Sequence, residues 1–294
     1  MLKIGIIGTG YFGEIHLKVL LELKNKFKVI GFNDVDKKRS QFITKTYNLP
    51  FFSLNELLEK SDVISICSKT SSHFNILKTV IANNKHVLVE KPICENINEI
   101  YELKRLLKNS KSTLQVGFIE RFNPAYLNLK SINFVPKSIQ CIRETSLLDR
   151  NKNNSIIHDL MIHDIDLINT IINSPPKSVK VIEKRKNKVN CIINFQNDCK
   201  VDLTSERTNT KNKTHSRIMN IKTVDNNEIN LDLSNHKITI NGKNKASNNN
   251  NRNINQLKEE YNYLYKSITE KKENMISLEA AEKCSIITEL IELK

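Results

Sequence analysis

The chain has 294 residues, of which 46 are Lys or Arg and 32 are Asp or Glu, so the formal net charge at pH 7 is +14. This length predicts about two domains, and 39% hydrophobic residues exclude a wholly disordered chain. No apolar run approaches the roughly 20 residues that cross a bilayer, and we predict neither a membrane span nor a signal peptide. The six cysteines form no CxxC pair, which favours buried, reduced thiols in a cytoplasmic protein.

The N-terminal part of the chain alternates between short β-branched runs and segments of helical periodicity. Strand-like runs lie at 2–7, 27–32, 63–67, 86–89 and 113–118, and helical periodicity lies at 12–24, 41–47, 74–82 and 97–107. This alternation is typical of a parallel, doubly wound sheet, in which we expect six short strands, these runs among them.

Beyond about residue 121, strand-like alternation dominates. We expect strands at 138–145, 178–184, 188–195, 200–207, 217–224, 228–233 and 237–240, a helix at 156–172, an Asn-rich loop at 242–255, and closing helices at 256–269 and 278–293. Most connections are too short for crossover helices, which favours antiparallel neighbours in one open sheet. The predicted architecture is therefore an α/β Rossmann domain over residues 1–120 and an α+β domain with a mostly antiparallel sheet over residues 121–294.

A glycine motif lies where the first predicted strand gives way to a helix. Gly8, Gly10 and Gly13, with Tyr11 and Phe12 between them, match G-x-G-x-x-G. The first glycine permits a tight turn, the second lets the backbone approach a pyrophosphate, and the third lets helix and strand pack closely. Amides at the helix N-terminus then face the phosphate charge. The motif predicts a dinucleotide site.

Asp34 ends the second predicted strand, where a carboxylate can accept hydrogen bonds from an adenosine ribose. A 2′-phosphate would meet this negative charge, so we predict NAD rather than NADP. Lys37, Lys38 and Arg39 follow closely and leave NADP open. Asp34 could instead cap the next helix, a role that Asp36 could fill equally well.

Lys91 follows the run 86–89, which we count as the fifth strand, in the sequence Val89-Glu90-Lys91-Pro92. Ligands bind outside the carboxyl ends of parallel strands, so a lysine there faces the ligand crevice. Beside a nicotinamide cation its ammonium loses a proton more easily, and it could exchange a proton with a substrate hydroxyl. The alternative is a surface lysine.

Asp159 and His163 lie four residues apart in the helix predicted at 156–172 and share one helical face. The carboxylate can accept hydrogen bonds from sugar hydroxyls, and the imidazole can relay a proton. Asp166 could orient the His163 ring. His158 and His163 diverge by about 140° on an α-helix, so we predict no metal site. A helix-capping Asp with a merely buried His is the structural alternative.

Together these motifs resemble the glucose-fructose oxidoreductase, inositol dehydrogenase and MocA family. The residues that carry the resemblance are Gly8, Gly10, Gly13 and His16, then Ser68, His73, Glu90, Lys91 and Pro92, and finally Asp159 and His163. The resemblance implies that Ser68, His73, Glu90 and Lys91 lie at the cofactor. It also implies that Lys91, Asp159 and His163 act on the substrate, and that the chain forms a homodimer or homotetramer.

Within this family, residues 116–125 and 159–166 look most like the UDP-N-acetylglucosamine 3-dehydrogenase branch. That likeness implies oxidation of the 3-hydroxyl of a UDP-N-acetylhexosamine to the 3-keto sugar, with Lys91 or His163 as the base. Arg121 and Asn123 would then contact the substrate. Alternatives are an inositol or free-sugar dehydrogenase, or an inactive dinucleotide-binding sensor. A nucleic-acid partner is suggested by the net charge alone, and we expect none.

Overall fold

The computed structural model describes residues 1–148, 152–209, 215–245 and 254–294. The chain forms two compact units. Met1–Phe118 and Leu257–Glu282 make the first unit, and Ile119–Gln256 and Lys283–Lys294 make the second. The predicted boundary after residue 120 lies close to this division. The assignment of all of 121–294 to the second domain was wrong, because residues 257–282 pack with the first unit.

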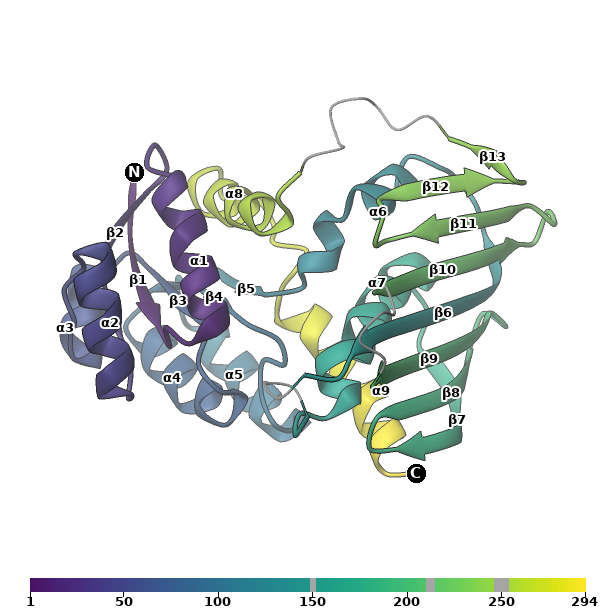
Figure 1. The fold of residues 1–294 in the computed structure, drawn as a ribbon, viewed down its shortest axis with the longest axis horizontal. Coiled ribbons are helices and arrows are strands. Elements are labelled where there is room, and N and C mark those ends of the chain that lie inside the picture. The colour runs from purple at the N-terminus through teal and green to yellow at the C-terminus, as the bar shows by residue number, and fades with distance from the viewer. Residues whose placement is uncertain (149–151, 210–214, 246–253) are drawn as a thin grey trace. The chain divides into compact units, whose positions relative to one another are not determined.

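The sheet of the first unit has five parallel strands in the order β2-β1-β3-β4-β5 (Figure 1). The strands are β1 (Leu2–Ile7), β2 (Phe27–Asn33), β3 (Val63–Ile66), β4 (His86–Val89) and β5 (Leu114–Val116). The side chains of β3, β4 and β5 and of residues 4–7 in β1 are mostly buried, as the continuous apolar runs predict, whereas the edge strand β2 is partly exposed. The expected sixth strand does not exist, because the chain passes directly from β5 into a 3-10 turn. Lys91 therefore follows the fourth strand, not the fifth.

Helices accompany this sheet at the predicted places, with one addition. They are α1 (Tyr11–Glu22), α2 (Lys37–Tyr47), α3 (Leu54–Lys60), α4 (Thr70–Ala82), α5 (Ile97–Lys108), α8 (Gln256–Thr269) and the start of α9 (Leu278–Glu292). The sequence analysis missed α3, although Ser53 and Glu56 form a capping box at its start. Leu257, Tyr261 and Leu264 of α8 are buried, which explains why this helix stays with the first unit.

The sheet of the second unit has eight strands in the order β13-β12-β11-β10-β6-β9-β8-β7. They are β6 (Pro136–Ser146), β7 (Pro176–Arg185), β8 (Lys188–Phe195), β9 (Lys200–Thr208), β10 (Ser216–Thr223), β11 (Glu228–Asp232), β12 (Lys237–Ile240) and β13 (Lys243–Asn244). The pair β6 and β9 is parallel and the other neighbours are antiparallel. This confirms an open, mostly antiparallel sheet. The two-residue strand β13 was not predicted.

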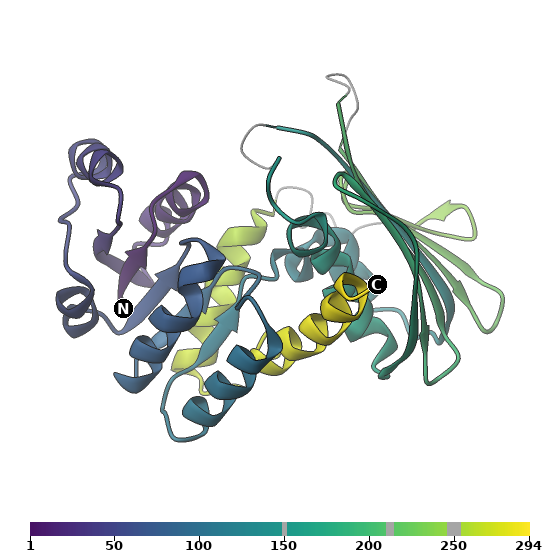
Figure 2. The same ribbon diagram turned by 90° about the horizontal axis from the view of Figure 1, so that it is seen from below.

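Helices of the second unit cover one face of this sheet, which Figure 2 shows nearly edge-on. They are the 3-10 helix η1 (Ile119–Phe122), α6 (Pro124–Leu129), the π-helix η2 (Ile157–Met161), α7 (Ile162–Ile172) and the end of α9. The sequence analysis missed η1 and α6, although Asn123 caps α6 and Pro124 begins it.

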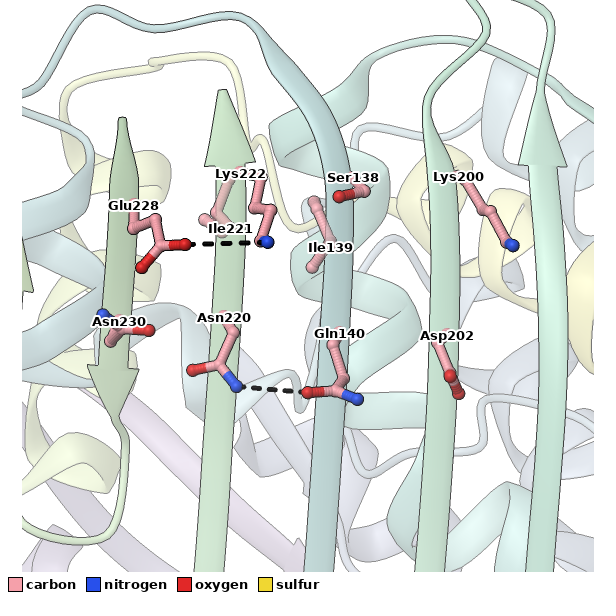
Figure 3. Close-up of a pocket in the computed structure, with 10 residues that line it drawn as sticks. All are labelled: Ser138, Ile139, Gln140, Lys200, Asp202, Asn220, Ile221, Lys222, Glu228 and Asn230. Atoms are coloured by element: carbon pink, nitrogen blue, oxygen red, sulfur yellow. Dashed lines mark hydrogen bonds and ion pairs between the residues drawn. The ribbon is translucent and has the colours of Figure 1, made fainter. Parts of the chain in front are cut away.

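The opposite face of the sheet is polar where Figure 3 shows it. A pocket of about 520 Å³ lies there among Gln140, Asp202, Asn220 and their neighbours on four adjacent strands. Gln140 accepts a hydrogen bond from Asn220, and Lys222 pairs with Glu228. None of the predicted site residues lines this pocket.

Three other expectations concern the whole chain. The Asn-rich loop predicted at 242–255 lies outside the described residues from 246 to 253. No helix among the described residues is long and apolar enough to cross a membrane. All six cysteines are free thiols, and five of them are buried.

Ile192 and Ile193 on β8 face opposite sides of the second sheet. Ile193 is fully buried and Ile192 is half-buried. Ile193→Ala should lower the free energy of unfolding by about 2–5 kcal/mol, because it leaves a cavity. The matched control Ile192→Ala should cost less than about 1 kcal/mol. Chemical denaturation measures both losses, and equal losses would contradict the assignment of inner and outer faces.

Candidate functional site

The glycine turn joins β1 to α1 and is shaped by contacts that exclude side chains. Gly8 has φ +82°, and a Cβ on it would lie 2.6 Å from the backbone of Ser68. A Cβ on Gly13 would overlap the carbonyl oxygen of Gly8. At Gly10, by contrast, a Cβ would meet no heavy atom within 4 Å. The fold itself therefore requires Gly8 and Gly13, whereas Gly10 leaves its backbone open to the approach of a phosphate.

Tyr11 and Phe12 open helix α1 directly after Gly10. Both side chains are exposed, and the helix N-cap has no side-chain hydrogen bond. The first backbone N–H groups of an α-helix have no partner within the helix, so this end can bind an anion. The residues at the turn thus fit the pyrophosphate of a dinucleotide.

Asp34 lies at the carboxyl end of β2 and holds the glycine turn. One carboxylate oxygen accepts hydrogen bonds from the backbone N–H of Thr9 at 2.6 Å and its hydroxyl at 2.8 Å. The other accepts from the backbone N–H of Asp36, and Asp36 itself caps α2. A carboxylate offers about four acceptor positions. Asp34 is therefore not the helix cap and retains capacity to accept from a ribose.

The Arg39 side chain binds the glycine turn and helix α1. Its guanidinium donates to the carbonyl oxygen of Thr9 and pairs with Glu14 on α1. This pairing, with further hydrogen bonds from Tyr47 and Lys18, lowers the pKa of Glu14 to about 2. Arg39 is thus already compensated by a carboxylate, which weakens the case for it as a 2′-phosphate ligand.

The Lys91 turn is linked to the glycine turn through His73 and Ser68. The His73 ring is buried, with Nε2 3.0 Å from the carbonyl oxygen of Ser68 and Nδ1 2.9 Å from that of Pro92. Burial lowers the pKa of His73. Ser68 in turn lies against Gly8. The first unit therefore gathers Gly8, Ser68, His73 and the turn with half-buried Lys91 into one contiguous region.

Glu90 and His73 are predicted cofactor residues whose side chains are enclosed. Glu90 is 8% exposed and packs over Gly117, where any Cβ would overlap its carboxylate. These contacts of Glu90 and His73 are with other protein groups. Both residues are therefore suited to hold the turn that carries Lys91 in place.

In the second unit, the segment with Asp159 and His163 begins as a π-helix and not as an α-helix. Ile157–Met161 is π-helical, and α7 continues from Ile162. The π pattern bonds residue i to i+5, so the α-helical angle used to separate His158 from His163 was the wrong geometry. Even so, the part of the chain that the structure describes contains no group of three or more His, Cys, Asp or Glu side chains suited to a metal.

Asp159 is held by an arginine from the sheet. Arg207 on β9 donates to the Asp159 carboxylate at 2.8 Å and to the carbonyl oxygen of Asn154 at 2.8 Å. The Arg207 side chain is fully buried, and 27% of the Asp159 side chain is exposed. The exposed part of the carboxylate can therefore meet a ligand, and half-buried His163 lies four residues further along the chain.

A second arginine from the sheet meets α7 at Asp164. Arg143 on β6 donates two hydrogen bonds of 2.8 Å to the Asp164 carboxylate and one of 3.1 Å to Glu120. Arg217 also donates to Glu120, at 2.7 Å. Burial on its own would raise the pKa of Glu120. The charges of Arg143 and Arg217 outweigh burial, so this pKa lies below its ordinary value. This network fixes α7 and η1 on the sheet.

Arg121 and Asn123, predicted as substrate residues, are both buried and bonded internally. Arg121 donates to both carboxylate oxygens of Asp166, at 2.8 and 2.6 Å. The Asn123 side chain donates to Glu120 and to the carbonyl oxygen of Leu233. Asp166, which was expected to orient His163, thus pairs with Arg121.

The sequence analysis missed Arg143 and Arg207, although the sequence contains a signal for both. Each lies at an inward-facing position of an alternating strand, where its neighbours two residues away are Cys141 and Ser205. A charged residue at an inward position must be paired. That rule could have directed attention to the carboxylates of the helix.

Residues 2–118 match the family model described as an oxidoreductase family with an NAD-binding Rossmann fold, GFO_IDH_MocA. The resemblance drawn from the motifs is thereby confirmed over residues 2–118.

Two named relatives are similar to a larger part of the chain. A UDP-N-acetylglucosamine 3-dehydrogenase of Acidithiobacillus ferrooxidans is 27% identical over 183 residues, which are 62% of this chain and 58% of that protein. An inositol 2-dehydrogenase of Salmonella paratyphi B is 27% identical over 202 residues, 63% of this chain and 59% of that protein. The aligned part thus spans less than two thirds of either relative.

A solved structure of UDP-N-acetylglucosamine 3-dehydrogenase from Acidithiobacillus ferrooxidans has the same fold. It aligns with a TM-score of 0.91 at 20% identity and covers 99% of this chain and 97% of that one. This likeness confirms the predicted fold of both units.

Gly10 and Gly13 give a matched test of the glycine turn. Gly13→Ala should lower the Tm, because the added methyl overlaps the Gly8 carbonyl oxygen, whereas Gly10→Ala should leave the Tm unchanged. Gly10→Ala should nevertheless weaken NADH binding by about tenfold, or about 1.4 kcal/mol, by closing the phosphate approach. Thermal unfolding and titration of nicotinamide fluorescence measure these effects. Normal NADH binding by Gly10→Ala would show that the pyrophosphate binds elsewhere.

Proposed function

We propose that the protein is an NAD-dependent dehydrogenase that oxidises a ring hydroxyl of a sugar, the 3-hydroxyl of a UDP-N-acetylhexosamine. The observation that carries the proposal is the contact chain from the glycine turn through Ser68 and His73 to the turn with Lys91. It brings a phosphate-binding backbone and a lysine into the same region of one unit. The choice of substrate is supported by the 27% identity with the UDP-N-acetylglucosamine 3-dehydrogenase.

The cofactor would be held by Gly8, Gly10 and the first amides of α1 at the pyrophosphate, and by Asp34 at the ribose. When bound, NAD accepts two electrons and a hydrogen from the carbinol carbon as hydride. We prefer NAD over NADP because Asp34 is negative and Arg39 is already paired with Glu14. Buried His73 and Glu90 would fix the shape of the turn.

The protein supplies the proton transfer. As the carbinol C–H bond breaks and its electron pair leaves as hydride, the hydroxyl gives its proton to Lys91 or His163 and the C=O bond forms. The products are the 3-keto sugar, NADH and one proton. Asp159, oriented by Arg207, would accept a hydrogen bond from a neighbouring hydroxyl.

Arg121 and Asn123 receive a supporting role in this proposal. The polar groups of Arg121 and Asn123 bind Asp166, Glu120 and a backbone carbonyl. The two residues would therefore support the residues that contact the substrate, and would not contact it themselves. Assembly into a homodimer or homotetramer stays a prediction.

The second candidate is an inositol dehydrogenase of the same family. The inositol 2-dehydrogenase of Salmonella paratyphi B has the same 27% identity over a slightly longer stretch. Both substrates are cyclic secondary alcohols and would use the same Lys, Asp and His chemistry.

A panel assay separates the candidates. The purified chain is mixed with NAD or NADP and with UDP-N-acetylglucosamine, UDP-N-acetylgalactosamine, free N-acetylglucosamine or myo-inositol, and nicotinamide absorbance is followed. We expect absorbance to rise with NAD and a UDP-N-acetylhexosamine. A rise with myo-inositol alone would favour the second candidate, and no rise with any alcohol despite NADH binding would favour a sensor.

Lys91→Ala should lower turnover by about 10²–10⁴-fold, the usual range for a lost acid or base. NADH affinity should stay near that of the parent chain, because the phosphate contacts remain. The control is Lys108→Ala, an exposed lysine at the end of α5, which should change neither quantity. Undiminished turnover in Lys91→Ala would remove this lysine from the mechanism.

A further inference from the structure

Two side chains of opposite charge, Asp34 and Arg39, bind the same residue of the glycine turn. Asp34 accepts from the backbone N–H and the hydroxyl of Thr9, and Nε of Arg39 donates to the carbonyl oxygen of Thr9 at 2.5 Å. A ribose bound to Asp34 would therefore have a guanidinium close to its 2′ position. An arginine near this carboxylate position is what accommodates the additional phosphate of NADP in dinucleotide-binding folds. The choice of cofactor thus depends on what else binds Arg39.

Glu14 on α1 binds the other end of the Arg39 guanidinium. Nη2 of Arg39 donates to one carboxylate oxygen of Glu14 at 2.5 Å. The other oxygen accepts from the hydroxyl of Tyr47, the last residue of α2, at 2.6 Å, and lies 3.0 Å from Nζ of Lys18. Hydrogen bonds from Arg39, Tyr47 and Lys18 lower the pKa of Glu14 to about 2. The Glu14 carboxylate is therefore fixed in place and charged at neutral pH.

The contacts of Arg39 leave little of this side chain for a ligand. Its guanidinium also lies over the ring of Phe42, with 4.8 Å between Cζ and the ring centroid. Only 23% of the Arg39 side chain is exposed. A phosphate that bound Arg39 would have to approach or displace the Glu14 carboxylate, which has the same sign of charge. Arg39 is therefore poorly placed to bind NADP as long as Glu14 is present.

We propose that Glu14 determines the preference for NAD over NADP, because it holds the Arg39 guanidinium on the glycine turn and keeps this cation away from a 2′-phosphate. The inference rests on the proposed function and names a specificity residue for its cofactor site. Asp34 repels the phosphate directly, whereas Glu14 acts through Arg39 and is a positioning residue. Without Glu14, Nε of Arg39 can stay on Thr9 while the two Nη groups, which carry most of the guanidinium N–H donors, turn to the phosphate.

The proposal is tested with Glu14→Ala. The Kd values of NADH and NADPH are measured by nicotinamide fluorescence at one salt concentration, because salt screens phosphate contacts. The NADPH Kd should fall about tenfold, as expected for one added hydrogen bond between charged groups, and the NADH Kd should stay near that of the parent chain. The matched control is Glu22→Ala, which removes an exposed glutamate from the other end of α1 and should change neither value. An unchanged ratio of the two Kd values in Glu14→Ala would overturn the proposal.

A double-mutant cycle with Arg39→Met separates the release of Arg39 from the simple loss of a negative charge. Glu14→Ala by itself makes the region more positive, and this alone favours a phosphate. In the Arg39→Met background there is no guanidinium to release, so Glu14→Ala should lower the NADPH Kd by clearly less than in the parent chain. Exposed Lys37 and Lys38 are present in both backgrounds and do not affect the comparison. The same gain in NADPH affinity with and without Arg39 would overturn the proposal.

Adenosine phosphates separate this inference from the proposed reaction, because they carry the ribose end of the cofactor without its nicotinamide. Calorimetry compares adenosine 2′,5′-bisphosphate with adenosine 5′-monophosphate. Glu14→Ala should raise the affinity for the bisphosphate relative to the monophosphate by about tenfold. The parent's relative affinity in Glu14→Ala would overturn this inference alone. A parent chain that shows this behaviour but oxidises no alcohol would contradict the proposed function alone, and a chain that binds neither compound nor NADH would contradict both.

Discussion

The structure depends on one constraint, which is that a charge removed from water must meet an opposite charge. Taking one partner away from a buried ion pair typically costs about 3–5 kcal/mol, a large part of the roughly 5–15 kcal/mol that stabilises a folded domain. In the second unit, Arg143 and Arg207 point from the sheet toward the helix that carries Asp164 and Asp159. These pairs fix where that helix begins and which side chains it turns toward the sheet.

The same constraint separates residues that hold the site from residues that are free to act. Asp166 and Asp164 are buried against arginines and serve the fold, whereas Asp159 keeps part of its carboxylate exposed while Arg207 orients it. In the first unit, Glu90 is buried against His16, and the adjacent Lys91 is half-buried. In each unit a buried contact between ionisable side chains lies next to the group to which we assign the chemistry. Such support is what keeps reacting groups in a fixed geometry.

Much of the fold could be predicted from the sequence because its signals are local. The apolar runs of the first sheet and the inward-outward alternation of the second follow from how each sheet is covered. The glycine turn was also predictable from its motif, although only Gly13 is required by a contact inside the motif, with Gly8, whereas Gly8 itself lies against the distant Ser68. Helices such as α8 were found with their correct bounds.

What the sequence did not reveal depends on contacts between distant residues. Nothing local indicates that α8 returns to the first unit, because that depends on how Tyr261 and Leu264 pack. The π-helical turn at Asp159 departs from the regular helix that the apolar pattern implies. Asp166 was expected to orient nearby His163, and no sequence signal indicated that it pairs with Arg121, 45 residues earlier. Proximity in sequence was a poor guide to partners wherever charges are buried.

The central claim is that the chain transfers hydride from C3 of a nucleotide sugar to NAD. It is tested most directly with UDP-N-acetylglucosamine carrying deuterium at C3, incubated with the chain and NAD and analysed by mass spectrometry. The account predicts that the NADH formed carries one deuterium and that the sugar loses that deuterium together with one proton. NADH that contains no deuterium, or a sugar that keeps its label while NADH forms, would contradict it.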